Sequence, residues 1–147
     1  TGVRVSDLAQ MGPQMMRGGW VYFTEKKGRS HIVKQREIKV LPELQEAIDA
    51  HTFKHLHFMV TEYGKPFTVK GLGQWFKDRC VEAGLPHCSA HGLRKAGATI
   101  AAENGATEQE LMAIYGWEDS EQAVLYTRKA NKRRLVDRGI HKIRLDE

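Results

Sequence analysis

His91 and Arg94 stand three positions apart in the segment His91-Gly92-Leu93-Arg94. Ser89 can cap a helix that begins just before them, and side chains three positions apart leave the same face of a helix. The first turn of a helix also offers unpaired N–H groups and the positive end of the helix dipole, and both favour an anion. The spacing therefore predicts that His91 and Arg94 can contact one phosphate group.

Cutting a phosphodiester without a metal ion requires three chemical functions. These are a nucleophile, charge stabilisation on the non-bridging phosphate oxygens, and an acid for the departing 5′ oxygen. Arginine suits the second function, because its planar fork donates two hydrogen bonds to a phosphate and stays charged. Tyrosine and lysine can supply the other two, and the chain contains residues of all three types.

Five motifs, in order along the chain, resemble those of the tyrosine recombinases, the phage integrase family. The segment from His91 to Arg94 matches the family's HxxR signature. Residues 1–8, T-G-V-R-V-S-D-L, resemble the first box of the family, T-G-x-R-x-S-[DE]-L. The resemblance covers nearly the whole chain, and it implies that Arg4 and Arg94 are the catalytic arginine pair, with His91 beside them.

A third motif of the family is a β-hairpin with a catalytic lysine, and Glu25-Lys26-Lys27-Gly28 resembles it. A strand that ends in Leu41-Pro42 follows, as in the family. The resemblance implies that Lys26 protonates the leaving 5′ oxygen. Lys27 stands where threonine is usual, and a shift of one residue would exchange the two lysines.

The last two motifs are Gly116-Trp117 and the segment around Tyr126. Most members of the family have Gly-His at the first of these, and a minority have tryptophan, whose indole N–H can donate to a phosphate. Tyr126 follows Trp117 by nine positions, which is the family's spacing between this residue and its nucleophile. The resemblance implies that Tyr126 forms a 3′-phosphotyrosine. Tyr115 is its nearest rival, and its position before Gly116 suits packing better.

Lys and Arg outnumber Asp and Glu by 23 to 18, which gives a net charge of +5. Such an excess favours polyanions, so we expect double-stranded DNA as a partner. Basic residues outside the catalytic motifs are expected to contact its phosphates, and the candidates are Lys27, Arg29, Lys34, Lys65, Lys70, Lys77 and Arg79. The family resemblance also implies a homotetramer on two DNA sites.

No metal, cofactor or membrane segment is expected. His51 and His55 are four positions apart, but no third ligand at useful spacing supports a site, and Cys80 and Cys88 form no CxxC pattern. The chain has no long apolar run and no signal-peptide pattern. We therefore expect a cytoplasmic, nucleoid-associated protein.

The elements that position these residues are expected to form a single, mainly helical α+β domain over residues 1–147. Trp20–Thr24 and Arg36–Leu41 contain β-branched or aromatic residues and predict a hairpin within a small antiparallel sheet of about three strands. Capping residues, glycines and apolar spacing predict helices over 1–11, 42–50, 68–84, 89–105 and 107–116, and from 119 or 120 onward, with a basic tail at 129–134.

The resemblance implies the DNA breaking-rejoining fold of the recombinase catalytic domain. It also implies a domain truncated at its N-terminus, without the family's N-terminal DNA-binding domain. We interpret the chain as a recombinase or integrase of a mobile genetic element.

Other functions fit part of the sequence. A DNA-binding module of the same fold would give no covalent product, and a type IB topoisomerase would relax supercoils as a monomer. A metal-dependent nuclease needs clustered carboxylates, and the aspartates show no such pattern.

Overall fold

The computed structural model describes residues 1–26 and 33–143, with the side chains of Lys26 and Arg133 left out. The chain divides into two compact units. Unit 1 contains Thr1 and Val3–Leu93, and unit 2 contains Gly2 and the residues from Arg94 onward. The expectation of a single domain stays a prediction.

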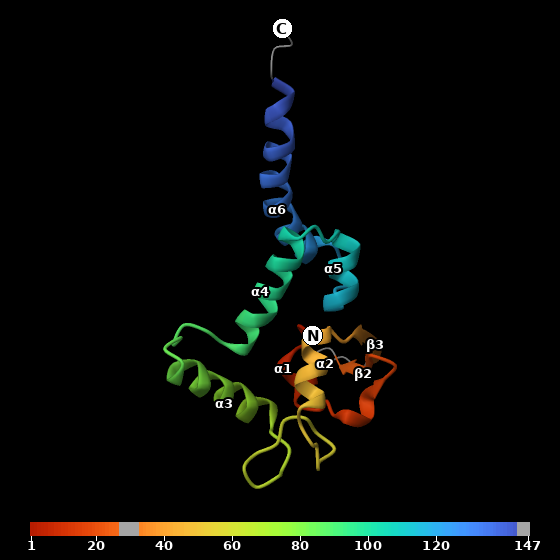
Figure 1. The fold of residues 1–147 in the computed structure, drawn as a ribbon, viewed down its shortest axis with the longest axis vertical. Coiled ribbons are helices and arrows are strands. Elements are labelled where there is room, and N and C mark those ends of the chain that lie inside the picture. The colour runs from red at the N-terminus through yellow and green to blue at the C-terminus, as the bar shows by residue number, and fades with distance from the viewer. Residues whose placement is uncertain (27–32, 144–147) are drawn as a thin grey trace. The chain divides into compact units, whose positions relative to one another are not determined.

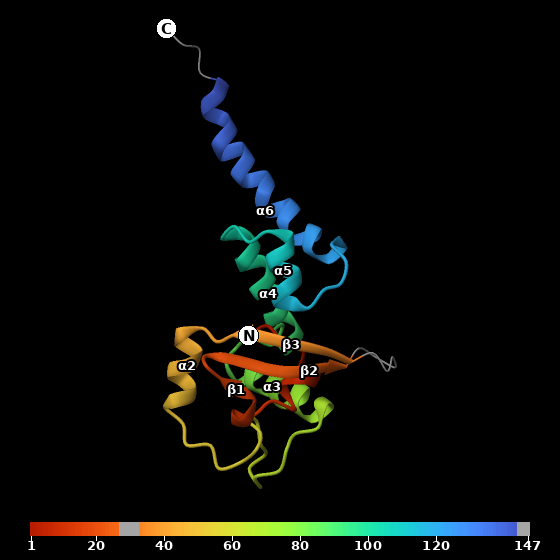
Figure 2. The same ribbon diagram turned by 90° about the vertical axis from the view of Figure 1, so that its right-hand side faces the viewer.

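Unit 1 contains a three-stranded antiparallel sheet in the order β1-β2-β3 (Figure 2). The strands are β1 (Met16–Arg17), β2 (Trp20–Lys26) and β3 (Val33–Lys39). The predicted hairpin is therefore confirmed, and its connection lies outside the described residues. The short strand β1 falls outside the predicted runs, and Gly18 and Gly19, both with positive φ, connect it to β2.

One face of this sheet is buried. Val21 and Phe23 on β2 share it with Ile38 on β3, and Met11 and Val40 complete the cluster. Side chains alternate across a strand, so Glu25 and Arg36 belong to the same face and are also buried. The core of unit 1 therefore contains two charged side chains at one end of the sheet.

The described part of unit 1 contains the helices α1 (Val5–Leu8), α2 (Pro42–Asp49) and α3 (Val69–Glu82). The prediction of a helix over 1–11 was wrong at both ends, because α1 spans only Val5–Leu8. Gly2 has a φ of 66° and Arg4 has extended backbone, so helical geometry begins only at Val5. The predictions for α2 and α3 are confirmed, and Thr68 caps α3 by accepting a hydrogen bond of 3.0 Å from the N–H of Gly71.

Helix α4 (Ala90–Glu103) crosses the boundary between the units, which falls between Leu93 and Arg94. Unit 2 also contains α5 (Glu108–Tyr115) and α6 (Glu121–Ile140), followed by a 3₁₀ turn (His141–Ile143). Figure 1 shows that α6 continues well beyond α5. The basic segment 129–134 is part of this helix, so the prediction of a tail there was wrong.

The predicted capping box at the start of α5 is present. Glu110 N–H donates to Thr107 Oγ1 at 3.2 Å, and the Thr107 N–H donates to the Glu110 carboxylate at 2.6 Å. These hydrogen bonds lower the pKa of Glu110. Gly116, in the left-handed conformation with a φ of 70°, ends the helix.

The core of unit 2 is built around Leu111, which is fully buried. Alanines from α4 and α6 and the ring of Tyr115 surround it: Ala98, Ala102, Ala123 and Ala130. Small side chains from two helices thus enclose Leu111.

None of the helices within residues 1–26 and 33–143 combines the length and the apolar character needed to span a bilayer.

Candidate active site

Arg4 lies at the N-cap position of α1 and forms an ion pair with Glu25 of β2. The second carboxylate oxygen of Glu25 accepts a hydrogen bond of 2.6 Å from Arg36 of β3. The side chains of Glu25 and Arg36 are 6% exposed, whereas that of Arg4 is 33% exposed. Arg4 is therefore held by a buried carboxylate and still reaches solvent.

Lys26 is the last residue of β2, where it pairs with Val33 of β3. It directly follows Glu25 in the chain. Lys27 and Arg29 lie outside the described residues. The assignment of the acid to Lys26 or to Lys27 therefore stays a prediction.

His91 and Arg94 lie one turn apart on α4, and His91 is exposed. Ser89 caps the first turn, because its Oγ accepts a hydrogen bond of 3.1 Å from the N–H of Gly92. The helix start predicted from the sequence is confirmed.

Arg94 is fixed by two backbone carbonyls within unit 2. Its guanidinium donates to the carbonyl oxygens of Gly2 and Tyr115, and its Cζ lies 5.1 Å from the centroid of the Tyr115 ring. These two hydrogen bonds position the guanidinium of Arg94.

Replacement of Gly2 by a residue with a Cβ would strain the backbone and crowd the ring of Tyr115. Its φ is 66°, and a Cβ built on it would lie 2.6 Å from Cε1 of Tyr115. Only glycine allows the backbone carbonyl to approach Arg94 in this conformation. The glycine of the first box thus has a structural explanation in the neighbourhood of Arg94.

Three aromatic rings stack in unit 2. Tyr115 and Trp117 have centroids 5.1 Å apart with 22° between their planes, and Trp117 and Tyr126 have centroids 5.5 Å apart with 8° between theirs. Gly116 turns the chain between the first two rings. Tyr126, on α6, is half-buried. The structure thus brings Arg94, Trp117 and Tyr126 together around Tyr115.

Tyr115 is a packing residue, as the sequence predicts. It is 4% exposed, and burial raises the pKa of its phenol, an effect that nearby Arg94 opposes and Tyr126 reinforces. A buried phenol with a raised pKa is a poor nucleophile. Of the two tyrosines in this stack, Tyr126 is the one with access to solvent.

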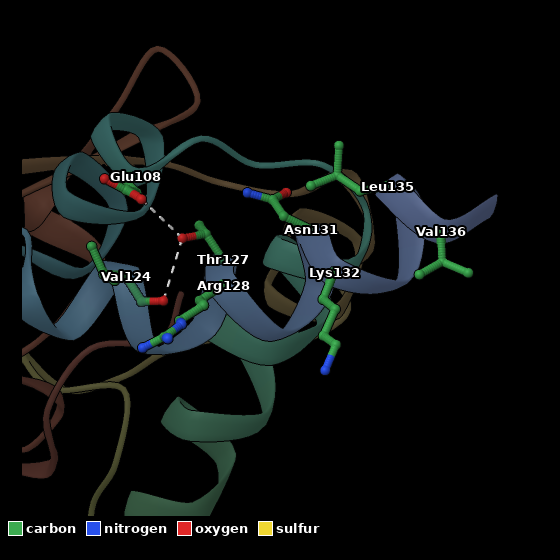
Figure 3. A pocket seen from close by; sticks show the side chains of 8 residues that line it. All are labelled: Glu108, Val124, Thr127, Arg128, Asn131, Lys132, Leu135 and Val136. Atoms are coloured by element: carbon green, nitrogen blue, oxygen red, sulfur yellow. Dashed lines mark hydrogen bonds between the residues drawn. The ribbon is translucent and has the colours of Figure 1, made fainter. Parts of the chain in front are cut away.

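The residue after Tyr126 fixes α6 against α5. Thr127 is buried, and its hydroxyl lies 3.1 Å from a carboxylate oxygen of Glu108 and 3.5 Å from the carbonyl oxygen of Val124 (Figure 3). The carbonyl of Ala123 is also in range. A pocket opens beside this contact, and none of the candidate catalytic residues lines it. Its lining consists of Glu108, Val124, Thr127, Arg128, Asn131, Lys132, Leu135 and Val136.

The expected DNA contacts differ in their surroundings. Lys65 and Lys70 are exposed, and Lys34 is half-buried on β3. The ammonium of Lys77 donates to the carbonyls of Pro86 and Cys88, a structural contact between α3 and the segment after it.

Sequence reasoning missed two residues, Glu25 and Arg36. The signal was present, since both occupy positions that the alternation of β2 and β3 assigns to the apolar face. Of the predicted catalytic residues, Arg4, Lys26 and His91 belong to unit 1, whereas Arg94, Trp117 and Tyr126 belong to unit 2.

Comparisons with known proteins agree with these motifs. The model of the family described as "Phage integrase family" matches residues 1–133. The putative prophage phiRv2 integrase of Mycobacterium tuberculosis (strain H37Rv) is 32% identical over 106 residues. That match covers 67% of this chain and 28% of the relative, so the chain corresponds to little more than a quarter of it.

Solved structures of recombinases share the fold. The XerA recombinase has a TM-score of 0.75 at 20% identity, over 99% of this chain and 55% of that one. The Tn1549 transposon integrase, in complex with transposon right end DNA, has a TM-score of 0.68 at 16% identity, over 92% of this chain and 55% of its own. A lambda integrase dimer bound to a COC′ core site has a TM-score of 0.64 at 16% identity, over 82% of this chain and 47% of that one.

Proposed function

Because the chain belongs to the phage integrase family, we propose that it is the catalytic part of a site-specific DNA recombinase that cuts and rejoins strands through a 3′-phosphotyrosine. Its fold, a small antiparallel sheet with surrounding helices, is that of the tyrosine recombinases. The observation that supports the chemistry best is the aromatic stack of Trp117 and Tyr126. It groups the proposed nucleophile, a proposed donor and, through Tyr115, the proposed phosphate ligand Arg94.

In the proposed cleavage step, the hydroxyl oxygen of Tyr126 attacks the scissile phosphorus in line with the 5′ oxygen. The phenol releases its proton to water, a bond forms between the tyrosine oxygen and phosphorus, and the bond to the 5′ oxygen breaks. Lys26, or Lys27 in its place, gives the leaving oxygen a proton. In rejoining, a 5′ hydroxyl attacks the phosphotyrosine and releases Tyr126. One phosphodiester replaces another, so no external energy source is needed.

The remaining residues stabilise the charged pentacoordinate state. Arg4 and Arg94 donate to the non-bridging oxygens, and His91 and the indole N–H of Trp117 add further hydrogen bonds. Donors preorganised in this way stabilise a transition state more than a ground state. Loss of one such donor typically costs about 2.7 to 4 kcal/mol in other enzymes.

Double-stranded DNA is the proposed partner, and a homotetramer on two DNA sites is the proposed assembly. The net charge of +5 supports the first part, because positive charge attracts a polyanion. Exposed lysines such as Lys65 and Lys70 are suited to phosphate contacts. Solved relatives described as DNA complexes also support it.

The test uses the full-length protein with nicked duplexes taken from the DNA that flanks its gene, in EDTA. We expect a covalent protein–DNA adduct that survives denaturing electrophoresis and is absent with Tyr126→Phe. Tyr63→Phe is the matched control, because Tyr63 is 80% exposed and lies outside the aromatic stack, and it should form the adduct as the parent does.

Absence of the adduct from a protein that binds the same duplex would favour a DNA-binding module. An adduct accompanied by relaxation of supercoiled plasmid by the monomer would favour a type IB topoisomerase. Loss of all activity in EDTA would indicate a metal-dependent nuclease.

A further inference from the structure

The ion group of Arg4, Glu25 and Arg36 includes two side chains on a sheet face whose other buried residues are apolar. β2 and β3 run side by side (Figure 2), and their buried face begins with Val21 and Ile38. Two charged side chains at the end of this face are costly to bury. Exchange of a buried ion pair for apolar side chains of similar volume is often neutral or stabilising, so fold stability alone does not account for the group.

The two oxygens of the Glu25 carboxylate contact two different arginines. Oε1 of Glu25 contacts Arg4, and Oε2 accepts from Arg36 at 2.6 Å. Arg36 is further held by a contact of 5.7 Å between its Cζ and the ring centroid of Phe23. Arg36 is therefore fixed in the interior, and the carboxylate between the two arginines has little freedom to move.

Arg4 differs from Arg36 in its access to solvent. Its side chain is 33% exposed, compared with 6% for that of Arg36. An arginine has five N–H donors in a planar fork, so one contact with Glu25 leaves others for a phosphate. The buried carboxylate thus sets the direction in which the open part of Arg4 points.

The carboxylate of Glu25 faces two cations rather than one. A carboxylate paired with Arg4 alone would offset its charge, and Coulomb repulsion between that carboxylate and the phosphate would oppose the negative charge that builds up in the transition state. Arg36 shares the carboxylate, so the negative charge of Glu25 does not fall on Arg4 alone. Lys34, the cross-strand partner of Glu25, adds a further cation on the same face of the sheet.

We propose that Glu25 is a positioning residue that orients Arg4 toward the scissile phosphate, and that Arg36 is the buried cation that keeps Glu25 from cancelling the charge of Arg4. The inference rests on the proposed function and extends it by two residues. Neither side chain needs to touch DNA. Both act through Arg4, and their effect belongs to the chemical step rather than to DNA binding.

The experiment measures the single-turnover rate of adduct formation at saturating nicked duplex, and the Kd for the same duplex, with the full-length protein. For Glu25→Gln we expect a rate about ten- to a hundredfold lower, as for other small misplacements of a catalytic group, with Kd unchanged. Glu37→Gln is the matched control, because Glu37 is an exposed carboxylate on the same strand as Arg36, and its rate should equal that of the parent.

The role of Arg36 is tested by comparing the rates of adduct formation of two variants that differ in charge at this position. Arg36→Met removes the cation at similar length, whereas Arg36→Lys keeps it. We expect the methionine variant to be slow and the lysine variant to recover most of the rate. Equal rates for the two variants would overturn the charge argument.

A double-mutant cycle separates action through Arg4 from a general structural effect. In an Arg4→Ala background, Glu25→Gln should cause no further loss of rate, because the two residues act as one unit. The proposal would be overturned if the rate losses of the two single variants multiplied in the double variant. It would also be overturned if Glu25→Gln formed the adduct at the rate of the parent.

All variants are assayed well below the melting temperature of the least stable one. If Glu25→Gln does not fold, Glu25→Asp replaces it, because its shorter side chain keeps the charge and cannot span both arginines. A parental rate in that variant would equally overturn the proposal. If the parent itself forms no adduct, the proposed function fails, and that outcome is distinct from a failure of the inference.

Discussion

The indole of Trp117 lies flat against the phenol of Tyr126, with 8° between the ring planes and 5.5 Å between the centroids. An offset parallel stack of this kind is a favourable contact between aromatic side chains. Trp117 stands where the resemblance to the family predicts histidine in most members. We therefore expect tryptophan to have two effects here, as an N–H donor and as the surface against which Tyr126, the proposed nucleophile, packs.

These two effects of Trp117 can be separated by substitution. Trp117→Phe keeps a ring for stacking and loses the N–H, so we expect the rate of adduct formation to fall by about a hundredfold. Trp117→Ala loses the stack as well, and a further loss of roughly two- to tenfold follows from the usual strength of such a contact. Trp117→His keeps a donor and should be faster than Trp117→Phe. A phenylalanine variant as fast as the parent would contradict the donor role.

Gly2 and Gly18 form a matched pair for a test of crowding. Both have positive φ, at 66° and 58°, but a Cβ on Gly2 would meet Tyr115 at 2.6 Å, whereas a Cβ on Gly18 would meet nothing within 4 Å. Gly18→Ala should reduce the free energy of unfolding by roughly 1 to 2 kcal/mol, the cost of left-handed backbone. Gly2→Ala should cost more, and it should slow adduct formation because the Gly2 carbonyl holds Arg94. Urea unfolding and the adduct assay measure the two effects, and equal costs would contradict the crowding.

The burial of the Tyr115 phenol leads us to expect a loss of stability at alkaline pH. Burial raises the pKa of its phenol, so the folded protein keeps a proton that the unfolded chain releases above a pKa of about 10. The stabilisation is fully present below that pH and is lost as the pH rises through the raised pKa of the folded state. Unfolding free energies measured across this range should fall less steeply for Tyr115→Phe. Tyr63→Phe, at an exposed position, is the control for the loss of a phenol hydroxyl.

Local signals in the sequence were sufficient for most of the helices. Thr68, Ser89 and Thr107 each cap a helix where the sequence places a cap, and Gly116 ends one where a glycine was expected. A cap depends on a side chain and a backbone group three residues apart, so it can be recognised without knowledge of the fold. The same is true of the hairpin formed by β2 and β3.

Contacts between distant segments could not be predicted in this way. Arg94 lies 92 positions from Gly2, and no local pattern connects them. The strand β1 has two residues and no periodicity to detect. Glu25 was missed because the predicted strand ended at Thr24, whereas β2 continues to Lys26 and its alternation makes Glu25 a core position.

The core around Leu111 has a consequence for how this protein tolerates random mutation. Four of its members are alanines, and every substitution of an alanine other than glycine adds volume. Overpacking of a filled core typically costs about 1 to 3 kcal/mol and shifts the backbone. In a saturation library, positions 98, 102, 123 and 130 should therefore accept few residues, whereas exposed Leu125, beside Tyr126, should accept many. Under the proposed function, variation that tunes the protein toward new DNA sites is expected to arise on surfaces rather than in this core.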